Sequence, residues 1–404
     1  MVSVETGLRL GALAAWLLGC SGSVVDPSTL SPVEGAGSAT HAGGRGGAPN
    51  VGGAGGAAAG RAGAGRNAGG MAGTFGGGAT SGIGGSATSG AGGSDHDCAC
   101  GGKAGAAGAP ATSAPMVGGC AMFPPEDDWN RDVSREAVDA VWTERLKNLV
   151  GGAKLHPDYG GDASALYGIP VGVVPQIQPL LPVTFDWYPE ESDPGPYPFP
   201  LPTEALIEGG DAMECDGDCH LLVVQQGTCQ LYEGYACRWE AGWHCGNGAH
   251  WDLTRVSYGQ RPMGWTSADA AGLAIAPGII RYDEVRAGAI NHAIRFTVDC
   301  TKSAFVKPAS HEAVPGGCSE SDPNAPPMGL RVRLRADYDI SKLSKSAQVV
   351  LTAMKRYGMI LADNGSNFYF QGEATRGWTD DDIEPLKSVP ASAFEAVNVP
   401  PLME

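Results

Sequence analysis

The sequence predicts a mainly β domain, and among β architectures it favours an antiparallel β-sandwich or jelly roll with a few peripheral helices. Short apolar runs rich in β-branched and aromatic residues recur along the C-terminal part of the chain. Gly, Pro and Asn-Gly turns separate these runs, and only two stretches have a clear helical period. Many short strands joined by turn residues are typical of these two architectures.

The N-terminal part of the chain predicts export rather than a folded domain. Residues 1–19 hold one Arg and then an apolar run too short to span a bilayer, which indicates a secretory signal peptide. Leu17-Leu18-Gly19-Cys20 resembles the lipobox of bacterial lipoproteins, which implies a lipid on Cys20 and anchoring to the outer membrane or cell surface. An ordinary signal peptide is the alternative. Residues 20–119 are largely Gly, Ala and Ser, so they predict a disordered tether.

The remaining residues, 120–404, are enough for one large domain or two small ones, and we expect a single disulfide-bonded β-sandwich domain. The first 119 residues hold five basic and five acidic side chains, so the whole net charge of −17 belongs to this domain. Such an acidic domain argues against nucleic acid as a partner, because phosphate binding needs a basic surface. The even number of cysteines in an exported domain predicts disulfide bonds rather than zinc sites. These are Cys120, Cys215, Cys219, Cys229, Cys237, Cys245, Cys300 and Cys318.

Two longer helices and one short helix are predicted. In residues 132–150, apolar side chains recur at helical spacing after Ser134, a suitable N-cap, and a Gly pair ends the pattern. Residues 344–358 show the same spacing and end at a Gly. Residues 380–387 resemble a short capped helix.

Strands are predicted where residues alternate between apolar and polar or where apolar runs lie between turns. Residues 167–182 contain several prolines and suit edge strands, and residues 190–200 form a proline-rich loop. Other strands are expected at residues 183–188, 273–280, 289–298, 329–338, 359–364 and 368–371.

Alternation also predicts which side chains of two strands are buried. His292 shares a face with Ile294 and Phe296, so we expect it in or near the core, hydrogen-bonded and without a catalytic role. In residues 329–338 the three arginines at positions 331, 333 and 335 share a face that we expect to be solvated.

The central feature of the domain is a predicted β-hairpin at residues 216–233. Two apolar runs flank Gln225–Thr228, and a two- or four-residue loop gives a register in which paired residue numbers add up to 453. His220 then lies opposite Glu233. Alternation places Asp216 and Asp218 on the same face as these two residues.

This acidic face favours glycoside hydrolysis, which needs two carboxylates, one of them protonated, on either side of the bond to be cleaved. Glu233 and Asp218 are the candidate pair, with His220 as a supporting residue and Glu208 or Asp283 in reserve. The sequence contains no nucleophile elbow, zinc-protease helix, Walker loop or dinucleotide-binding loop.

Aromatic residues near the hairpin are candidates for stacking on sugar rings, although a buried core position is the alternative for each of them. The candidate substrate-binding residues are Tyr197, Tyr235, Trp239, Trp243 and Trp265, together with Arg281.

Three runs resemble a group of exported actinobacterial and myxobacterial proteins of unsettled activity. They are ESDPGPYPFP, RPMGWTSADAAGL followed by PGIIRYDEV, and MKRYGMILADNGSNFYF. The resemblance extends over most of residues 125–397. It implies an exported single domain and transfers no catalytic residue.

Three other interpretations remain open. A polysaccharide lyase would use His220 or Tyr235 as its base, but the acidic domain disfavours the uronate substrate. A non-catalytic carbohydrate-binding or adhesion lipoprotein would use the same aromatic residues. In that case Asp216 and Asp218 can hold a structural Ca²⁺, and no other cofactor is expected. Finally, the polar hairpin face can simply be solvated.

Overall fold

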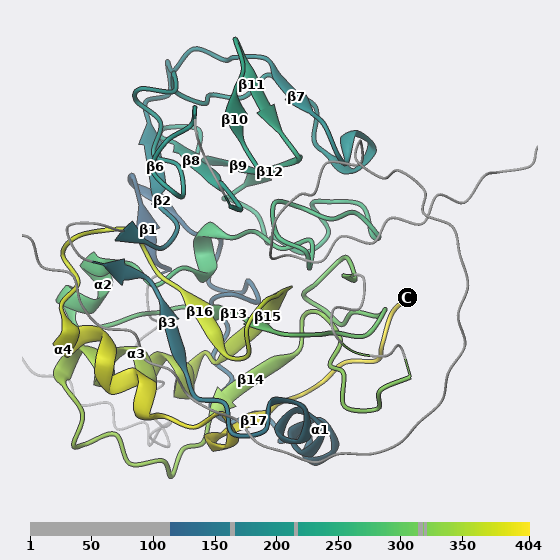
Figure 1. The fold of residues 1–404 in the computed structure, drawn as a ribbon, viewed down its shortest axis with the longest axis vertical. Helices are drawn as coiled ribbons and strands as arrows, with labels where there is room; N and C mark the ends of the chain where they lie inside the picture. The colour runs from purple at the N-terminus through teal and green to yellow at the C-terminus, as the bar shows by residue number, and fades with distance from the viewer. Residues whose placement is uncertain (1–113, 162–165, 214–216, 314–317, 319–320) are drawn as a thin grey trace, which may run out of the picture. The chain divides into compact units, whose positions relative to one another are not determined.

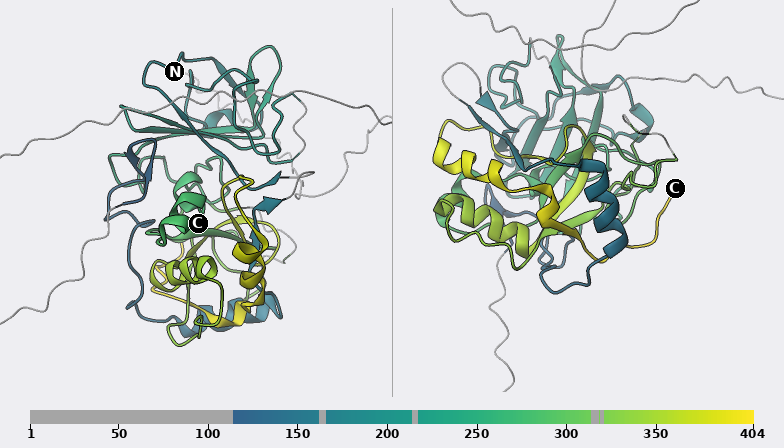
Figure 2. Two further views of the ribbon diagram at one scale, coloured as in Figure 1. Left: turned by 90° about the vertical axis from the view of Figure 1, so that its left-hand side faces the viewer. Right: turned by 60° about the horizontal axis from the view of Figure 1, so that its bottom comes forward.

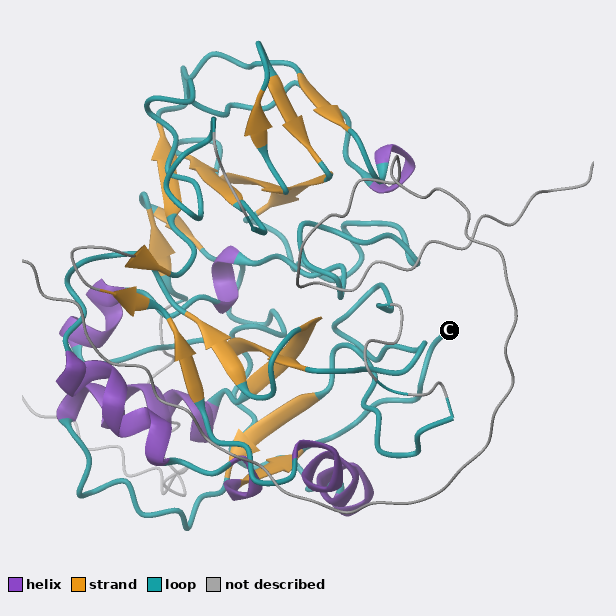
Figure 3. Ribbon diagram, in the orientation of Figure 1, coloured by secondary structure: helices purple, strands orange, loops and turns teal. Residues whose placement is uncertain are grey.

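The structure, a computed structural model, describes residues 114–161, 166–213, 217–313, 318 and 321–404 (Figure 1). The predicted signal peptide, Cys20 and all but the last residues of the predicted tether lie outside the described residues. The described part is mainly β with few helices, as the sequence predicts. Its strands form several sheets in which some neighbours run parallel, so a single antiparallel sandwich or jelly roll is not confirmed (Figure 3).

A four-stranded sheet carries the predicted hairpin. Its order is β12-β9-β8-β6, where β6 is Val171–Val174, β8 is Leu221–Gln225, β9 is Gln230–Tyr235 and β12 is Asn247–Asp252. A three-stranded sheet, β10-β11-β7, consists of Arg238–Trp239, Trp243–Cys245 and Val183–Phe185. Apolar side chains from the four-stranded and the three-stranded sheet pack together in one hydrophobic cluster.

A six-stranded mixed sheet lies in the larger core, in the order β17-β14-β15-β13-β16-β3. In that order its strands are Phe394–Ala396, Arg331–Leu334, Met359–Asn364, Ile294–Val298, Tyr369–Gln371 and His156–Asp158. Two short hairpins complete the strands, β1 (Met116–Val117) with β2 (Cys120–Ala121), and β4 (Gly160–Gly161) with β5 (Leu166–Tyr167).

The helices are short. They are α1 (Ala140–Val150), α2 (Tyr282–Ala287), α3 (Lys345–Arg356) and α4 (Asp380–Ile383), with 3₁₀ turns at Pro189–Glu191, Ala276–Gly278, Glu384–Ser388 and Ala391–Ala393. Figure 2 shows α2 and α3 side by side. Among the residues that the structure describes, no helix has the length and hydrophobicity needed to cross a membrane.

The predicted helices are found, with one change of boundary. The helix expected from residue 132 begins only at Ala140, because Asp139 rather than Ser134 caps it and accepts a hydrogen bond from the Trp142 backbone N–H. Residues 273–280, expected to be a strand, instead contain the 3₁₀ turn at Ala276–Gly278.

The predicted solvated face of residues 329–338 is wrong for two of its arginines. Arg331 and Arg333 are buried. Arg331 donates to the carbonyls of Asp128 and Tyr357, and Arg333 donates to the carbonyl of Val133 at 2.5 Å. The segment that precedes α1 covers this face, and the long guanidinium side chains satisfy carbonyls that would otherwise be buried without donors.

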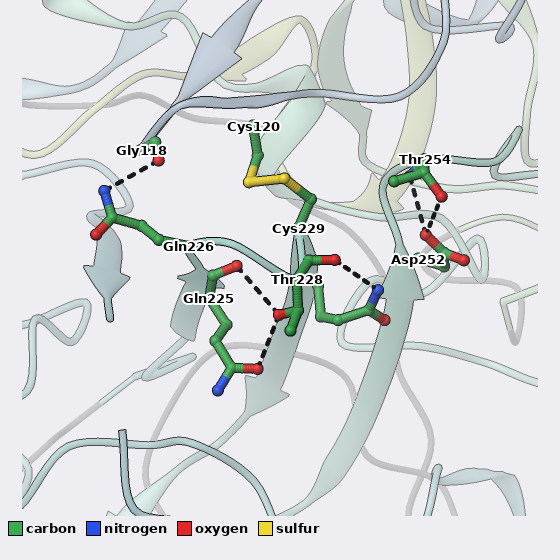
Figure 4. The surroundings of a disulfide bond; sticks show 9 residues. Gly118, Cys120, Gln225, Gln226, Thr228, Cys229, Asp252 and Thr254 are labelled. Carbon is green, nitrogen blue, oxygen red and sulfur yellow. Dashed lines mark hydrogen bonds between the residues drawn. A yellow bond between two sulfur atoms is a disulfide. The ribbon is translucent and has the colours of Figure 1, made fainter. Parts of the chain in front are cut away.

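The predicted register of the central hairpin is wrong by two residues. Leu222 rather than His220 pairs with Glu233. The reason lies in the turn: Cys229 has a positive φ of 50° and is bonded to Cys120, so it belongs to the turn and not to the strand (Figure 4). The two-residue shift leaves Glu233 on the predicted face of its strand, but that face is buried.

The predicted disulfide bonds are present among the described residues. Cys120 is bonded to Cys229, Cys237 to Cys245, and Cys300 to Cys318, and Cys219 is also disulfide-bonded. Cys215 lies outside the described residues.

The Cys120–Cys229 bond is expected to contribute most to stability. It joins residues 109 apart, and the loop-closure relation predicts a loss of about 4–5 kcal/mol when both are replaced by Ser. The double substitution at Cys237 and Cys245, only 8 residues apart, serves as the control and should cost about 2–3 kcal/mol. Urea unfolding of both variants tests this order, and equal losses would contradict it.

Candidate functional site

The candidate site begins at a β-bulge in the six-stranded sheet. β13 and β15 pair in register up to Phe296 and Leu361, and then the register shifts so that Thr297 pairs with Asp363. Regular alternation would place Asp363 on the apolar face with Leu361. The extra residue turns it to the face that carries Arg295, as bulges beside functional sites often do.

Arg295 is the cation at the centre of the site. Its side chain is buried, its Nε donates to Asp269 Oδ2 at 3.3 Å, and its Nη1 donates to Gln371 Oε1 at 2.7 Å. Its Nη2 lies 3.2 Å from Asp269 Oδ1 and 3.8 Å from Asp363 Oδ2. One guanidinium thus joins two carboxylates that lie far apart in the sequence.

The loop that carries Asp269 is docked directly on the bulge. The Ala271 backbone N–H donates to the carbonyl of Ala362 at 2.9 Å. The Ser267 hydroxyl donates to the carbonyls of Asp269 and Leu273, which closes the loop into a compact turn. Burial raises the pKa of Asp269, and Arg295 opposes this effect.

His220 supplies the second cation. Its Nδ1 lies 2.6 Å from Glu208 Oε2, and its Nε2 lies 3.2 Å from the carbonyl of Ala268. Because both ring nitrogens face acceptors, the site suits a doubly protonated ring. Burial lowers the pKa of His220, but the carboxylates of Glu208 and Asp218 outweigh it and raise the pKa to about 9. His220 is therefore a buried imidazolium that also holds the start of the Asp269 loop.

Asp363 and Asp218 are among the carboxylates of the cluster that reach solvent, and Glu208 and Asp158 are also partly exposed. The Asp363 side chain keeps 30% of its exposure. Asp218 is exposed before β8, and its carbonyl accepts a hydrogen bond from the Ala236 backbone at 2.8 Å. Burial and the carboxylates of Asp269 and Asp218 raise the pKa of Asp363 to about 7, although Arg295 lowers it. Asp363 can therefore hold a proton near neutral pH, and Asp218 lies close enough to influence it.

Asp158 completes the cluster from the edge strand β3, where it pairs with Gln371 of β16. Burial and the nearby Glu208 carboxylate raise the pKa of Asp158, and a hydrogen bond with Gln371 opposes them. The site thus gathers carboxylates around two cations. Its members are Asp158, Glu208, Asp218, Asp269 and Asp363, with Arg295 and His220.

Glu233 is not one of the solvent-accessible carboxylates of this region. It is 0% exposed, and its carboxylate accepts hydrogen bonds from the backbone N–H groups of Ile275 and Ala276 at 2.9 Å and from Trp251 Nε1 at 3.1 Å. Burial raises its pKa to about 7, and these hydrogen bonds partly oppose the shift. This burial disfavours the expected pairing of Glu233 with Asp218 as catalytic carboxylates.

A short run of aromatic rings leads from the cluster to the surface. The ring centroids of His220 and Tyr235 are 5.6 Å apart, and those of Tyr235 and Trp187 are also 5.6 Å apart. Trp187 is 55% exposed. Gly246 allows this arrangement, because a Cβ there would lie 2.5 Å from the Trp187 ring, and its backbone bonds to both Tyr235 and Trp187.

The other predicted substrate-binding residues have different positions. Tyr197 and Trp243 are buried in the second apolar cluster, where Tyr197 donates to the Asp193 carbonyl and Trp243 to the Pro200 carbonyl. Trp239 is half-buried and packs edge-on against Trp243.

Trp265 and Arg281 also make internal contacts. Trp265 is half-buried, with the Arg261 guanidinium 5.6 Å from its ring centroid. Arg281 is buried and paired with Glu284 at the start of α2. His292 is buried and hydrogen-bonded to Glu284 and to the Ala293 carbonyl, which confirms its expected core position.

Within the described ranges, no group of three or more His, Cys, Asp and Glu side chains has the arrangement of a metal site. The calcium site suggested for Asp216 and Asp218 is not tested by this observation, because Asp216 lies outside those ranges.

Comparisons with known proteins give no further guide to the chemistry of the site. No protein-family model, curated sequence or solved structure matches this chain. The roles of its residues therefore rest on geometry and electrostatics.

Sequence reasoning identified Asp218, His220, Tyr235 and, in reserve, Glu208. It missed Asp269, Arg295, Asp363, Asp158 and Trp187. One local signal was available: Asp363 ends an apolar strand directly before an Asn-Gly turn, and strand ends often carry functional groups.

Proposed function

We propose that this chain is a polysaccharide-active enzyme, a glycoside hydrolase with Asp363 as the general acid and Asp218 as the second carboxylate. The observation that carries the proposal is the bulge that turns the partly exposed Asp363 to the face of Arg295, where burial and the carboxylates of Asp269 and Asp218 raise its pKa to about 7. Glycosidases need such a pair, with one carboxyl protonated and one ionised. Arg295, whose Nη2 lies 3.8 Å from Asp363 Oδ2, orients the carboxyl group.

The aromatic run supports a sugar as substrate. Tyr235 packs beside His220 of the cluster and Trp187 packs beside Tyr235, and aromatic faces bind the apolar faces of sugar rings. A lyase is the less favoured enzyme, because the pKa of His220 is raised to about 9 and its ring would therefore be protonated and unable to act as a base near neutral pH. Arg281, the candidate substrate-binding arginine, is buried at the start of α2 and cannot neutralise a uronate in the site. We further propose that the enzyme is an exported lipoprotein, anchored through Cys20 and displayed on its tether.

A screen of the full-length protein against a polysaccharide panel tests this proposal. Reducing ends without unsaturated products would support the hydrolase, and unsaturated products would replace it by a lyase. Binding without any product would indicate a carbohydrate-binding lipoprotein, for which the exposed Trp187 and Tyr188 already provide a surface. Absence of both binding and products would reject the carbohydrate proposal.

Trp187→Ala should weaken substrate binding about tenfold, since stacking of this kind contributes on the order of 1–1.5 kcal/mol. KM or Kd should rise while kcat and the melting temperature stay nearly unchanged, because the ring is largely exposed. Tyr167→Ala is a matched control, since Tyr167 is equally exposed but lies on β5. Equal affinities of the wild type and Trp187→Ala would exclude Trp187 from the binding site.

A further inference from the structure

A groove separate from the carboxylate cluster lies between α2, with the turn that follows it, and α3. Its volume is about 600 Å³, within the usual range of ligand sites. One wall is a single face of α3, formed by Lys345, Gln348, Val349, Thr352, Ala353 and Arg356. At 1.5 Å per residue, Lys345 and Arg356 are about 16 Å apart along the helix, so the groove is elongated.

The charges that line the groove are all positive. Arg286 and Lys345 lie near one end and Arg356 near the other, and the described lining includes no Asp or Glu. This contrasts with the net charge of −17 carried by the chain as a whole. A positively lined groove on an acidic protein favours an anionic ligand there.

Two of these cations are held in place from outside the groove. Arg286 is paired with Asp382 and donates to the Ser346 hydroxyl at 3.0 Å. Arg356 Nε donates to Asp132 at 2.8 Å. Lys345 is exposed and forms no ion pair within the described residues. The arginines are therefore oriented in advance, with part of their charge offset by Asp382 and Asp132, and Lys345 supplies a charge that has no ion-pair partner among the described residues.

Neutral hydrogen-bonding side chains occupy the space between the cations. Asn291, Ser346, Gln348 and Thr352 offer amides and hydroxyls, and Val285 and Ile290 are apolar contacts. Widely spaced cations with neutral polar groups between them match a ligand with many hydroxyls and few anionic groups. Nucleic acids carry a phosphate at every unit and would need a denser row of cations.

We propose that this groove is a binding site for an acidic glycan, an oligosaccharide whose carboxylate groups reach Lys345 at one end and Arg356 at the other. The site is independent of the proposed hydrolase chemistry, since none of its lining residues belongs to the carboxylate cluster. A second binding site of this kind would hold the protein on an acidic polymer.

Calorimetric titration of the full-length protein with defined oligosaccharides tests the proposal. A galacturonic acid hexamer should bind, the dimer should bind at least tenfold more weakly because it cannot reach both ends, and a neutral glucan hexamer should not bind at this site. Lys345→Glu and Arg356→Gln should each weaken hexamer binding by about three- to tenfold. Increasing salt should also weaken it.

Lys342→Glu is the matched control, because Lys342 is exposed near α3 but does not line the groove. Equal losses for Lys342→Glu and Lys345→Glu would show a long-range charge effect and overturn the proposal. Failure of the hexamer to bind would also overturn it, as would preferential binding of linear polyphosphate. Circular dichroism melts of each variant separate a loss of affinity from a loss of fold.

Discussion

Asp363→Asn is expected to reduce kcat/KM for polysaccharide cleavage by about 10²–10⁴-fold, the usual contribution of a general acid. The amide cannot protonate the leaving oxygen but fills the same space beside Arg295. Substrate binding should persist, because Trp187 and Tyr235 are unchanged. Asp337→Asn, a neutralisation at an exposed site, is the matched control and should retain full activity.

The pH dependence provides a second test of Asp363. Its pKa is raised to about 7, so it is protonated below that pH and the wild-type kcat/KM should fall about tenfold per pH unit above it. The residual activity of Asp363→Asn should lack this alkaline limb. If the limb persists in the variant, another group is the general acid.

The substitution Asp363→Asn, which should lower activity, should not lower the stability of the fold at alkaline pH. A carboxyl whose folded pKa is raised binds its proton more tightly in the folded state, so it makes the protein less stable as pH rises from about 4 to 7. Asp363→Asn removes this loss and should be at least as stable as the wild type at pH 8. If Asp363→Asn loses activity but keeps its stability, Asp363 behaves as a functional residue rather than as a packing residue.

Glu233→Ala is expected to destabilise the fold by about 3–5 kcal/mol, the largest stability effect of a single substitution that we predict. It leaves the backbone N–H groups of Ile275 and Ala276 and the indole N–H of Trp251 without their acceptor, all in the core. Glu240→Ala, at an exposed carboxylate, should change stability little and serves as the control. Urea unfolding at pH 8 measures both variants.

Glu233→Gln then separates a structural role from a catalytic one. It retains one acceptor oxygen, so a folded fraction should survive and should cleave substrate as fast per folded molecule as the wild type. It should also remove the part of the stability loss that Glu233 causes between about pH 4.5 and 7, since its folded pKa is raised to about 7. A folded but inactive Glu233→Gln protein would restore Glu233 as a catalytic residue.

Local sequence patterns are enough to predict the elements that depend on neighbouring residues. The period of residues 344–358 predicted α3, alternation predicted the buried His292 just before β13, and the Asn-Gly pair predicted the turn between β15 and β16. Helix and strand periodicity, caps and turns are local properties of the chain, so a single sequence is enough to recognise them. The predicted disulfide bonds follow in the same way from the even number of cysteines and from the export that the N-terminal residues predict.

The groups of the candidate site, in contrast, come together through contacts between residues that lie far apart in the chain. The hairpin register depended on Cys120, a residue distant in sequence that holds Cys229 in the turn. The orientation of Asp363 depended on one extra residue in β15, which no alternation pattern of that strand reveals. Asp269 and Arg295 meet because a loop docks on that bulge, and pairing across such distances in the chain is set by packing of the whole core.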